Sequence, residues 1–295
     1  MNAPADLAAL AFPPRPDVEY TLADVPAEIA VAPLPLWRRI GSHDGLRRLL
    51  VVAVFLAAWE IVARLQDNDL MLPTFWQTLQ ALVEGMRSGE LPAKAAISLS
   101  LLLKGYAVGV GCAFVLTSLA VATRWGRDVL FTLTAMLNPL PPIALLPLAL
   151  LWFGLGQASL VFVLVHSVLW PLSLATLTGF QSVPSTLRMA GRNYGLTGSR
   201  YVLQLLIPAA LPSILSGLKI GWAFAWRTLI AAELVFGASS GKGGLGWYIF
   251  QNRNELYTDK VFAGLLVVIA IGLVIDLVVF GTLEKLTVRR WGTQQ

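Results

Sequence analysis

Residues 182–212, SVPSTLRMAGRNYGLTGSRYVLQLLIPAALP, form a polar, basic stretch between two long apolar segments. The stretch contains three arginines, Arg188, Arg192 and Arg200, and no Asp or Glu. Each arginine would cost ~2.5–3.5 kcal/mol at the centre of a lipid bilayer. The stretch is therefore predicted to lie outside the membrane, on one face, between two segments that cross it.

The same stretch carries the signals of two short helices. Gly195 is a residue that commonly ends a helix, and the proline at the start suits a first turn, which together predict a helix over residues 185–194. A second helix is predicted to begin at Thr197 or Ser199 and to end near Pro208. Two short helices on a membrane surface indicate a docking surface for a partner protein.

The composition of the whole chain is that of an integral membrane protein. Of its 295 residues, 56% are hydrophobic and 13% are charged, and the mean hydropathy is +0.69. The net charge is +5, but the basic residues lie at the ends of apolar runs, which argues against nucleic-acid binding. One cysteine and two histidines, His43 and His166, give little basis for a metal site.

Six apolar segments predict six membrane-spanning helices in an all-α membrane domain at residues 46–290, after a Pro-rich cytoplasmic N-terminal tail at residues 1–45. The predicted spans are approximately residues 49–65, 95–122, 129–155, 160–178, 214–236 and 261–283. Arginines and lysines concentrate in the segments that this order places in the cytoplasm. We therefore expect a multi-pass protein of the inner (plasma) membrane with both termini in the cytoplasm.

Residues 66–94, between the first two spans, are predicted to include an amphipathic helix on the outer surface. Apolar residues recur there at helical spacing, at Phe75, Leu79, Leu82, Val83 and Met86.

The third apolar segment contains four prolines, Pro139, Pro141, Pro142 and Pro147. A proline in a spanning helix leaves backbone groups without partners, which is tolerated where neighbouring helices or water supply them. This span is therefore predicted to be a kinked or broken helix that lines a path, and a simple kink in a packed helix is the alternative.

Charged residues also fall within or at the edges of the predicted spans, namely Glu60, Lys104, Lys219, Arg227, Glu233 and Asp276. At 1.5 Å rise per residue, Asp276 and Lys219 lie ~22 Å and ~25 Å from the outer surface, which predicts a pair. Arg227 and Lys104 both lie ~14 Å deep and need separate partners or water. Such charges either pair between helices or line a water-filled substrate route. His166 is expected to be a packing histidine whose hydrogen bonds are satisfied.

The polar stretch resembles the cytoplasmic loop of the permease subunits of ATP-binding-cassette importers. The motif of that loop runs Glu-Ala-Ala, then Gly, then Ile/Leu-Pro further on. Here it reads Met189-Ala190-Gly191, Gly195 and Ile207-Pro208-Ala209-Ala210-Leu211-Pro212, so the motif's Glu and its second Ala are replaced. Four more segments resemble the nitrate/sulfonate/taurine branch of these permeases: residues 137–156, 231–240, 243–246 and 259–264.

The resemblance implies a type I importer permease fold, with six transmembrane helices and cytoplasmic coupling helices. It implies a homodimer of permease subunits in the membrane lipid, two copies of a cytoplasmic ATPase subunit, and a periplasmic solute-binding protein. The residues implied to couple to the ATPase are Met189, Ala190, Gly191, Gly195, Ile207, Pro208 and Pro212. The residues expected to line the path or to pair in the membrane are Lys104, Pro141, Pro142, Lys219, Arg227, Glu233 and Asp276.

Because Met189 replaces the motif's Glu, contact with the ATPase is expected to depend on apolar packing and on close backbone approach at Gly191. The chain itself is not expected to be an enzyme or to bind a cofactor. It contains no G-x-x-x-x-G-K-[ST] phosphate-binding loop, so ATP and Mg²⁺ would bind to the partner ATPase.

The expected solute is a small anion such as nitrate, a sulfonate or taurine, or a similar organic anion. The main alternative is a secondary transporter or channel driven by ion gradients, which would be active without an ATPase. A membrane enzyme would need clustered catalytic groups, whereas the polar groups here are scattered.

Overall fold

The structure is a computed structural model that describes residues 44–121, 123–236 and 243–289. The predicted N-terminal tail lies almost wholly outside the described residues, as do residues 237–242 of the predicted outer loop. The chain divides into two compact units, residues 1–54 and 55–295. In the first unit, the described part is the beginning of one helix, and all that follows below concerns the second unit.

Every regular element in the described part of the chain is a helix, in agreement with the predicted all-α fold. The elements are α2 (Asp44–Gln66), α3 (Phe75–Arg87), α4 (Glu90–Val121), α5 (Arg124–Leu137), η2 (Pro142–Leu145), α6 (Leu146–Phe153), α7 (Gln157–Ser182), α8 (Ser185–Asn193), α9 (Gly198–Tyr201), η3 (Val202–Leu206), α10 (Ile207–Phe236), α11 (Leu245–Asn254), α12 (Thr258–Val274), η4 (Ile275–Phe280), α13 (Gly281–Glu284) and η5 (Lys285–Arg289). Among the described residues, five helical segments are long and apolar enough to cross a membrane. The bent pair of α5 with η2–α6 makes a sixth if it counts as one span.

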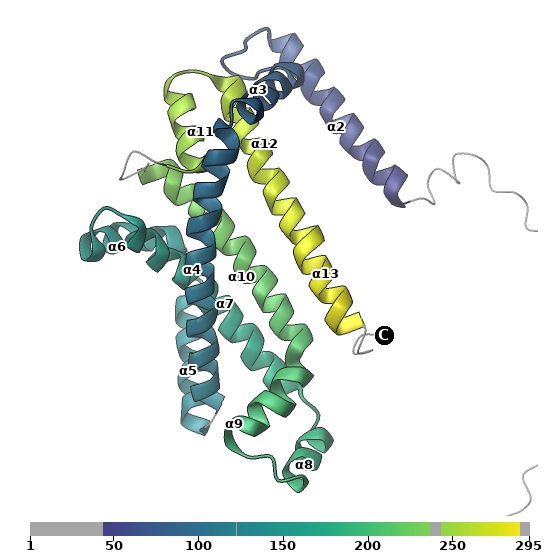
Figure 1. The fold of residues 1–295 in the computed structure, drawn as a ribbon, viewed down its shortest axis with the longest axis vertical. Helices are drawn as coiled ribbons and strands as arrows, with labels where there is room; N and C mark the ends of the chain where they lie inside the picture. The colour runs from purple at the N-terminus through teal and green to yellow at the C-terminus, as the bar shows by residue number, and fades with distance from the viewer. Residues whose placement is uncertain (1–43, 122, 237–242, 290–295) are drawn as a thin grey trace, which may run out of the picture. The chain divides into compact units, whose positions relative to one another are not determined.

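The centre of the second unit is a bundle in which α7 packs along α4 and α10 (Figure 1). Two glycines of α4, Gly105 and Gly109, lie against Leu164 and Val168 of α7, and a Cβ atom at either glycine would clash with these side chains. Glycines spaced four residues apart let membrane helices approach closely, so that α4 and α7 gain van der Waals contact along this face. In Figure 1, α8 and α9 lie at one end of the bundle, and α3 and α11 lie at the other.

The amphipathic helix predicted after the first span is present as α3. Its first turn is closed by a capping box, in which the Gln77 N–H donates to Thr74 Oγ1 and the Thr74 N–H donates to Gln77 Oε1. The buried face of α3 consists of small residues, Thr78, Ala81 and Gly85, which face α12 and α4. The large apolar side chains of α3 are therefore mostly left at the surface.

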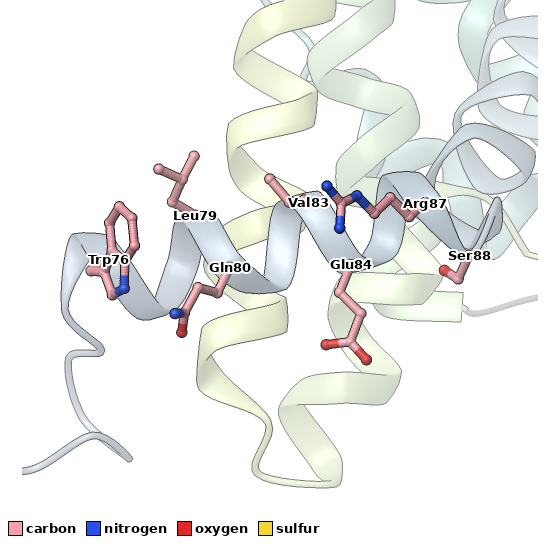
Figure 2. A pocket seen from close by; sticks show the side chains of 7 residues that line it. All are labelled: Trp76, Leu79, Gln80, Val83, Glu84, Arg87 and Ser88. Carbon is pink, nitrogen blue, oxygen red and sulfur yellow. The ribbon is translucent and has the colours of Figure 1, made fainter.

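A groove of about 570 Å³ runs along this exposed side of α3. Figure 2 shows the side chains that line it, which are Trp76, Leu79, Gln80, Val83, Glu84, Arg87 and Ser88. The indole of Trp76 lies near the N-terminal end of α3, and the charged pair Glu84 and Arg87 lies near its C-terminal end. None of the residues singled out by the importer motif lies in this groove.

The third apolar segment is broken, as its prolines predicted. The axes of α5 and of the segment Pro142–Phe153 differ by 89°. Pro141 has an extended backbone with φ −60° and ψ 121°, and Pro142 begins the next helical turn. Because a proline disfavours helical geometry in the residue before it, the consecutive prolines separate the two helices at this point. Figure 1 shows that α5 begins at the α8 end of the bundle and that α6 lies part-way along α4.

The prediction that the second short helix ends near Pro208 is wrong. The chain continues from α9 through η3 into α10 without interruption, and Pro212 also lies inside α10. η3 is a π-helical segment, at whose end the Ile207 N–H donates to Val202 O, five residues earlier. Local π-helical adjustment re-satisfies backbone groups that a proline would otherwise leave unpaired, so the helix tolerates Pro208. The fifth span therefore begins earlier than predicted.

Candidate functional site

The C-terminal end of α8 is capped by Gly195, as the sequence predicted. Gly195 has φ +75°, in the left-handed region that favours glycine. Its N–H donates to Arg192 O at 2.9 Å, and the Leu196 N–H donates to Gly191 O at 3.0 Å. This pair of bonds is the Schellman motif, which satisfies the last carbonyls of a helix and reverses the chain direction.

Gly191 joins α8 to the start of the fifth span. It is buried, and a Cβ atom at this position would clash with Leu205 of η3. The sequence predicted close backbone approach to a partner at Gly191, but the approach lies within the chain itself. The missing side chain therefore serves to pack α8 against η3, which continues into α10.

Arg188 joins α8 to the end of the fourth span. Its Nη2 atom donates to Phe180 O at 2.5 Å and to Gln181 O at 3.2 Å, and its Nε atom donates to Val183 O at 3.1 Å. The last carbonyls of a helix lack partners within the helix and carry partial negative charge, so a guanidinium there is stabilising. The sequence had shown Arg188 only as a positive charge outside the membrane, because no local pattern indicates which carbonyls it reaches.

The opposite face of α8 is exposed and partly apolar. Leu187, Met189 and Tyr194 have exposed fractions of 42%, 57% and 87%, and Ala190 is exposed as well. The remaining residues of the predicted coupling set, Ile207, Pro208 and Pro212, are partly buried in the first turns of α10. The set thus divides into a surface on α8 and a layer behind it that connects α8 to the bundle.

Two of the intramembrane charges form a pair between helices. Lys219 Nζ of α10 lies 2.9 Å from Asp276 Oδ1 of η4, and these are the residues that the depth argument paired. Lys104 and Arg227 are exposed and make no ion pair with the residues that the structure describes. The Arg227 guanidinium lies 6.0 Å from the centre of the Phe224 ring.

Glu233 is buried at the other end of α10, with 3% of its surface exposed. Its carboxylate accepts from Ser98 Oγ of α4 at 2.9 and 3.0 Å and from the Gly246 N–H at 2.8 Å. Ser98 Oγ in turn accepts from the Leu245 N–H at 2.9 Å, and a Cβ atom at Gly244 would clash with both side chains. Glu233 therefore anchors the start of α11 to α4 and α10, and the ion pair between helices that was considered for it is not observed among the described residues.

The neighbouring helix α11 carries a buried tyrosine, Tyr248, with 2% of its surface exposed. Burial raises the pKa of Tyr248 to about 12, and the carboxylates of Glu90, Asp259 and Glu84 act in the same direction. The Tyr248 hydroxyl therefore stays protonated at physiological pH, and α11 packs against the bundle as a neutral surface.

A cavity of about 140 Å³ lies beside the break in the third segment. Its walls include Asn138, Pro141 and Pro142 from the break, His166 and Trp170 from α7, and Phe224 from α10. Both ring nitrogens of His166 and the Nε1 atom of Trp170 are buried without a hydrogen-bond partner in the described part of the chain. The expectation of a satisfied packing histidine is therefore wrong. A buried polar group without a partner costs ~1–3 kcal/mol.

Residues 105–281 match the family model described as the binding-protein-dependent transport system inner membrane component. The chain belongs to this family. It is a permease subunit of an ATP-driven ATP-binding-cassette importer, in the nitrate/sulfonate/taurine branch, and its helices form the type I importer permease fold. In such importers, the ATPase and the solute-binding protein are separate partners of the inner-membrane permease.

Similar permeases cover most of the length of this permease. It is 30% identical over 263 residues to the taurine transport system permease protein TauC of Escherichia coli, which spans 85% of this chain and 92% of the relative. It is 32% identical over 243 residues to the putative aliphatic sulfonates transport permease protein SsuC of the same organism, spanning 81% and 88%. The nitrate import permease protein NrtB of Synechocystis sp. is 28% identical over 244 residues, spanning 80% and 87%.

Proposed function

We propose that this permease forms, as a homodimer, the translocation path for a small anionic solute that a periplasmic binding protein delivers. Two cytoplasmic ATPase subunits bind ATP and Mg²⁺ and drive the cycle. The relatives support the class of solute, because their names refer to taurine, aliphatic sulfonates, nitrate and bicarbonate. Each of these solutes carries three oxygen atoms on one central atom.

The observation that carries the proposal is the double attachment of α8. Arg188 binds the end of α7, and Gly191 packs against η3 at the start of the fifth span. An ATPase subunit that docks on the exposed face of α8 would therefore move the fourth and fifth spans together. Rigid-body movement of packed helices around a path is a common form of alternating access.

The placement of the two ends supports an orientation. The α8 end carries the exposed coupling surface and faces the cytoplasm, where both termini lie. The α11 end, with residues 237–260 of the outer loop, faces the periplasm and meets the loaded binding protein. Glu233 fixes part of this surface to α10, so the two ends of the permease are connected by one helix.

The test uses the cap of α8. Gly195→Arg places a side chain at φ +75°, which costs ~1–2 kcal/mol, and adds a charge beside the docking surface. We expect this variant to lose the co-purifying ATPase and ATP-driven uptake in proteoliposomes. Gly195→Asn is the matched control, because Asn tolerates the left-handed region, and it is expected to retain both.

Retention of ATPase and uptake by Gly195→Arg, in a variant that is inserted and folded, would contradict the coupling role of α8. Solute uptake by the wild type in the absence of any ATPase would instead support a transporter driven by an ion gradient.

A further inference from the structure

The cavity beside the broken span has the size of a small solute group. Its volume of about 140 Å³ is enough for a few water molecules or for a central atom with three oxygens. No acidic side chain belongs to its lining among the described residues, and prolines of the break form one wall. The cavity is therefore compatible with an anion, and it lies at the segment whose prolines predict a path.

Two hydrogen-bond donors on the wall lack partners in the described structure. Trp170 is 92% buried, with 8% of its surface exposed, and its Nε1–H makes no hydrogen bond there. His166, one turn earlier on α7, has both nitrogens buried and unpartnered, and one of them carries a hydrogen in the neutral ring. The centres of the two rings are 6.1 Å apart. Neighbouring buried donors without protein acceptors indicate an acceptor that comes from outside the chain.

A positive charge lies close to the same wall. Phe224 of α10 lines the cavity, and the Arg227 guanidinium lies 6.0 Å from the centre of its ring. Arg227 makes no ion pair with any residue that the structure describes. In an environment of low dielectric constant, this charge favours an anion in the cavity over a neutral or cationic solute.

We infer that this cavity binds the oxyanion group of the transported solute during its passage. Trp170 Nε1–H and an imidazole N–H of His166 donate to its oxygens, and Arg227 supplies the attracting charge. The inference rests on the proposed import function and adds to it a site within the permease, beyond the selectivity of the binding protein. The ligand class is an anion with three oxygens on one atom, such as nitrate, bicarbonate or a sulfonate.

The direct test follows the indole N–H of Trp170 by ¹⁵N–¹H NMR in the purified, ¹⁵N-labelled permease with its ATPase. The probes are nitrate, bicarbonate and methanesulfonate, each compared with chloride at equal ionic strength, and Trp170→Phe identifies the signal. We expect at least one probe to shift the Trp170 signal in a saturable way. The absence of a saturable shift with all three probes would overturn the inference.

Trp222 is the matched reference for this test. Its Nε1–H is also buried without a partner in the described residues, and its exposed fraction is likewise 8%. However, it packs in the core, with ring centres 5.3 Å from Tyr106 and 6.4 Å from Phe280, away from the cavity lining. Its NMR signal is expected to stay unchanged by the probes, and an equal shift of both signals would contradict a site at Trp170.

The functional test compares Trp170→Phe with Trp222→Phe in proteoliposomes that contain the ATPase and the binding protein. Loss of one hydrogen bond to a charged group predicts about tenfold lower uptake for Trp170→Phe, with basal ATP hydrolysis and ATPase co-purification unchanged. Trp222→Phe is expected to transport like the wild type. Equal uptake by the two variants would refute the cavity site. Absence of ATP-driven uptake in the wild type would refute the import function instead, and the NMR result would still decide on the cavity.

Discussion

At the scale of single residues, neighbouring side chains of α8 have different tasks. Arg188 and Gly191 face the bundle and attach α8 to α7 and η3, whereas Met189, between them, is exposed. The replacement of the motif's Glu by Met189 therefore changes the docking surface and leaves the attachment intact. The sequence identified the motif positions, but it did not indicate that Gly191 packs inward, because this depends on the position of Leu205.

Arg188 is predicted to transmit movement from the ATPase to the fourth span. Arg188→Met keeps the length of the side chain but leaves the carbonyls of Phe180, Gln181 and Val183 without their donor, a loss of ~1.5–3 kcal/mol. We expect several-fold less solute transported per ATP hydrolysed, with the ATPase still bound. The measurement is simultaneous uptake and ATP hydrolysis in proteoliposomes.

The control for Arg188 is Arg192→Met, since Arg192 is exposed on the same helix and its side chain has no hydrogen bond recorded in the described structure. An unchanged transport-to-hydrolysis ratio in Arg188→Met would show that this side chain is not part of the coupling.

At the scale of elements, prolines have opposite outcomes in the third and fifth spans. Pro141 and Pro142 separate α5 from η2 at an angle of 89°, whereas Pro208 and Pro212 lie within a continuous helix. The sequence predicted the first outcome and missed the second. The difference arises because η3 adopts π geometry, with Leu205 and Leu206 buried among Phe180, Val183 and Ala210. That packing partner lies on another part of the chain and leaves no trace in the local sequence.

The Lys219–Asp276 pair is predicted to stabilise the packing of α10 against η4. Lys219→Met leaves Asp276 as an uncompensated charge in a membrane span, which costs up to ~2.5–3.5 kcal/mol. We expect a lower unfolding temperature in detergent for this variant. The double variant Lys219→Met/Asp276→Leu removes both charges and is expected to recover most of the loss. A double variant no more stable than the single one would mean that the pair does not determine this packing.

At the scale of the whole permease, one continuous helix joins the two functional ends. From Ile207 to Glu233, α10 covers ~39 Å at 1.5 Å per residue. Its beginning follows η3, which contacts α8, and its end holds the start of α11 through Glu233. Binding of a loaded solute-binding protein at one end and ATP binding at the other would therefore act on the same rigid element.

Glu233 is predicted to transmit the signal of the binding protein. Glu233→Gln replaces a carboxylate oxygen with an amide group, so the Ser98 hydroxyl and the Gly246 N–H can no longer both be satisfied as in the wild type. We expect several-fold weaker stimulation of ATP hydrolysis by the loaded binding protein, while the ATPase still co-purifies. Glu84→Gln, an exposed change on α3 at the same end, is the control and should respond normally. Normal stimulation in Glu233→Gln would refute this role.

The sequence by itself determined the membrane class, the apolar spans, the helix stop at Gly195 and the break at Pro141 and Pro142. These features follow from hydropathy and backbone preferences, which are properties of short stretches of chain. Only the tertiary structure decided that Glu233 binds Ser98, 135 residues away, and that His166 and Trp170 share a cavity. Satisfaction of a buried polar group depends on which segments the bundle brings together, so these partners become visible only when α4, α7 and α10 are packed.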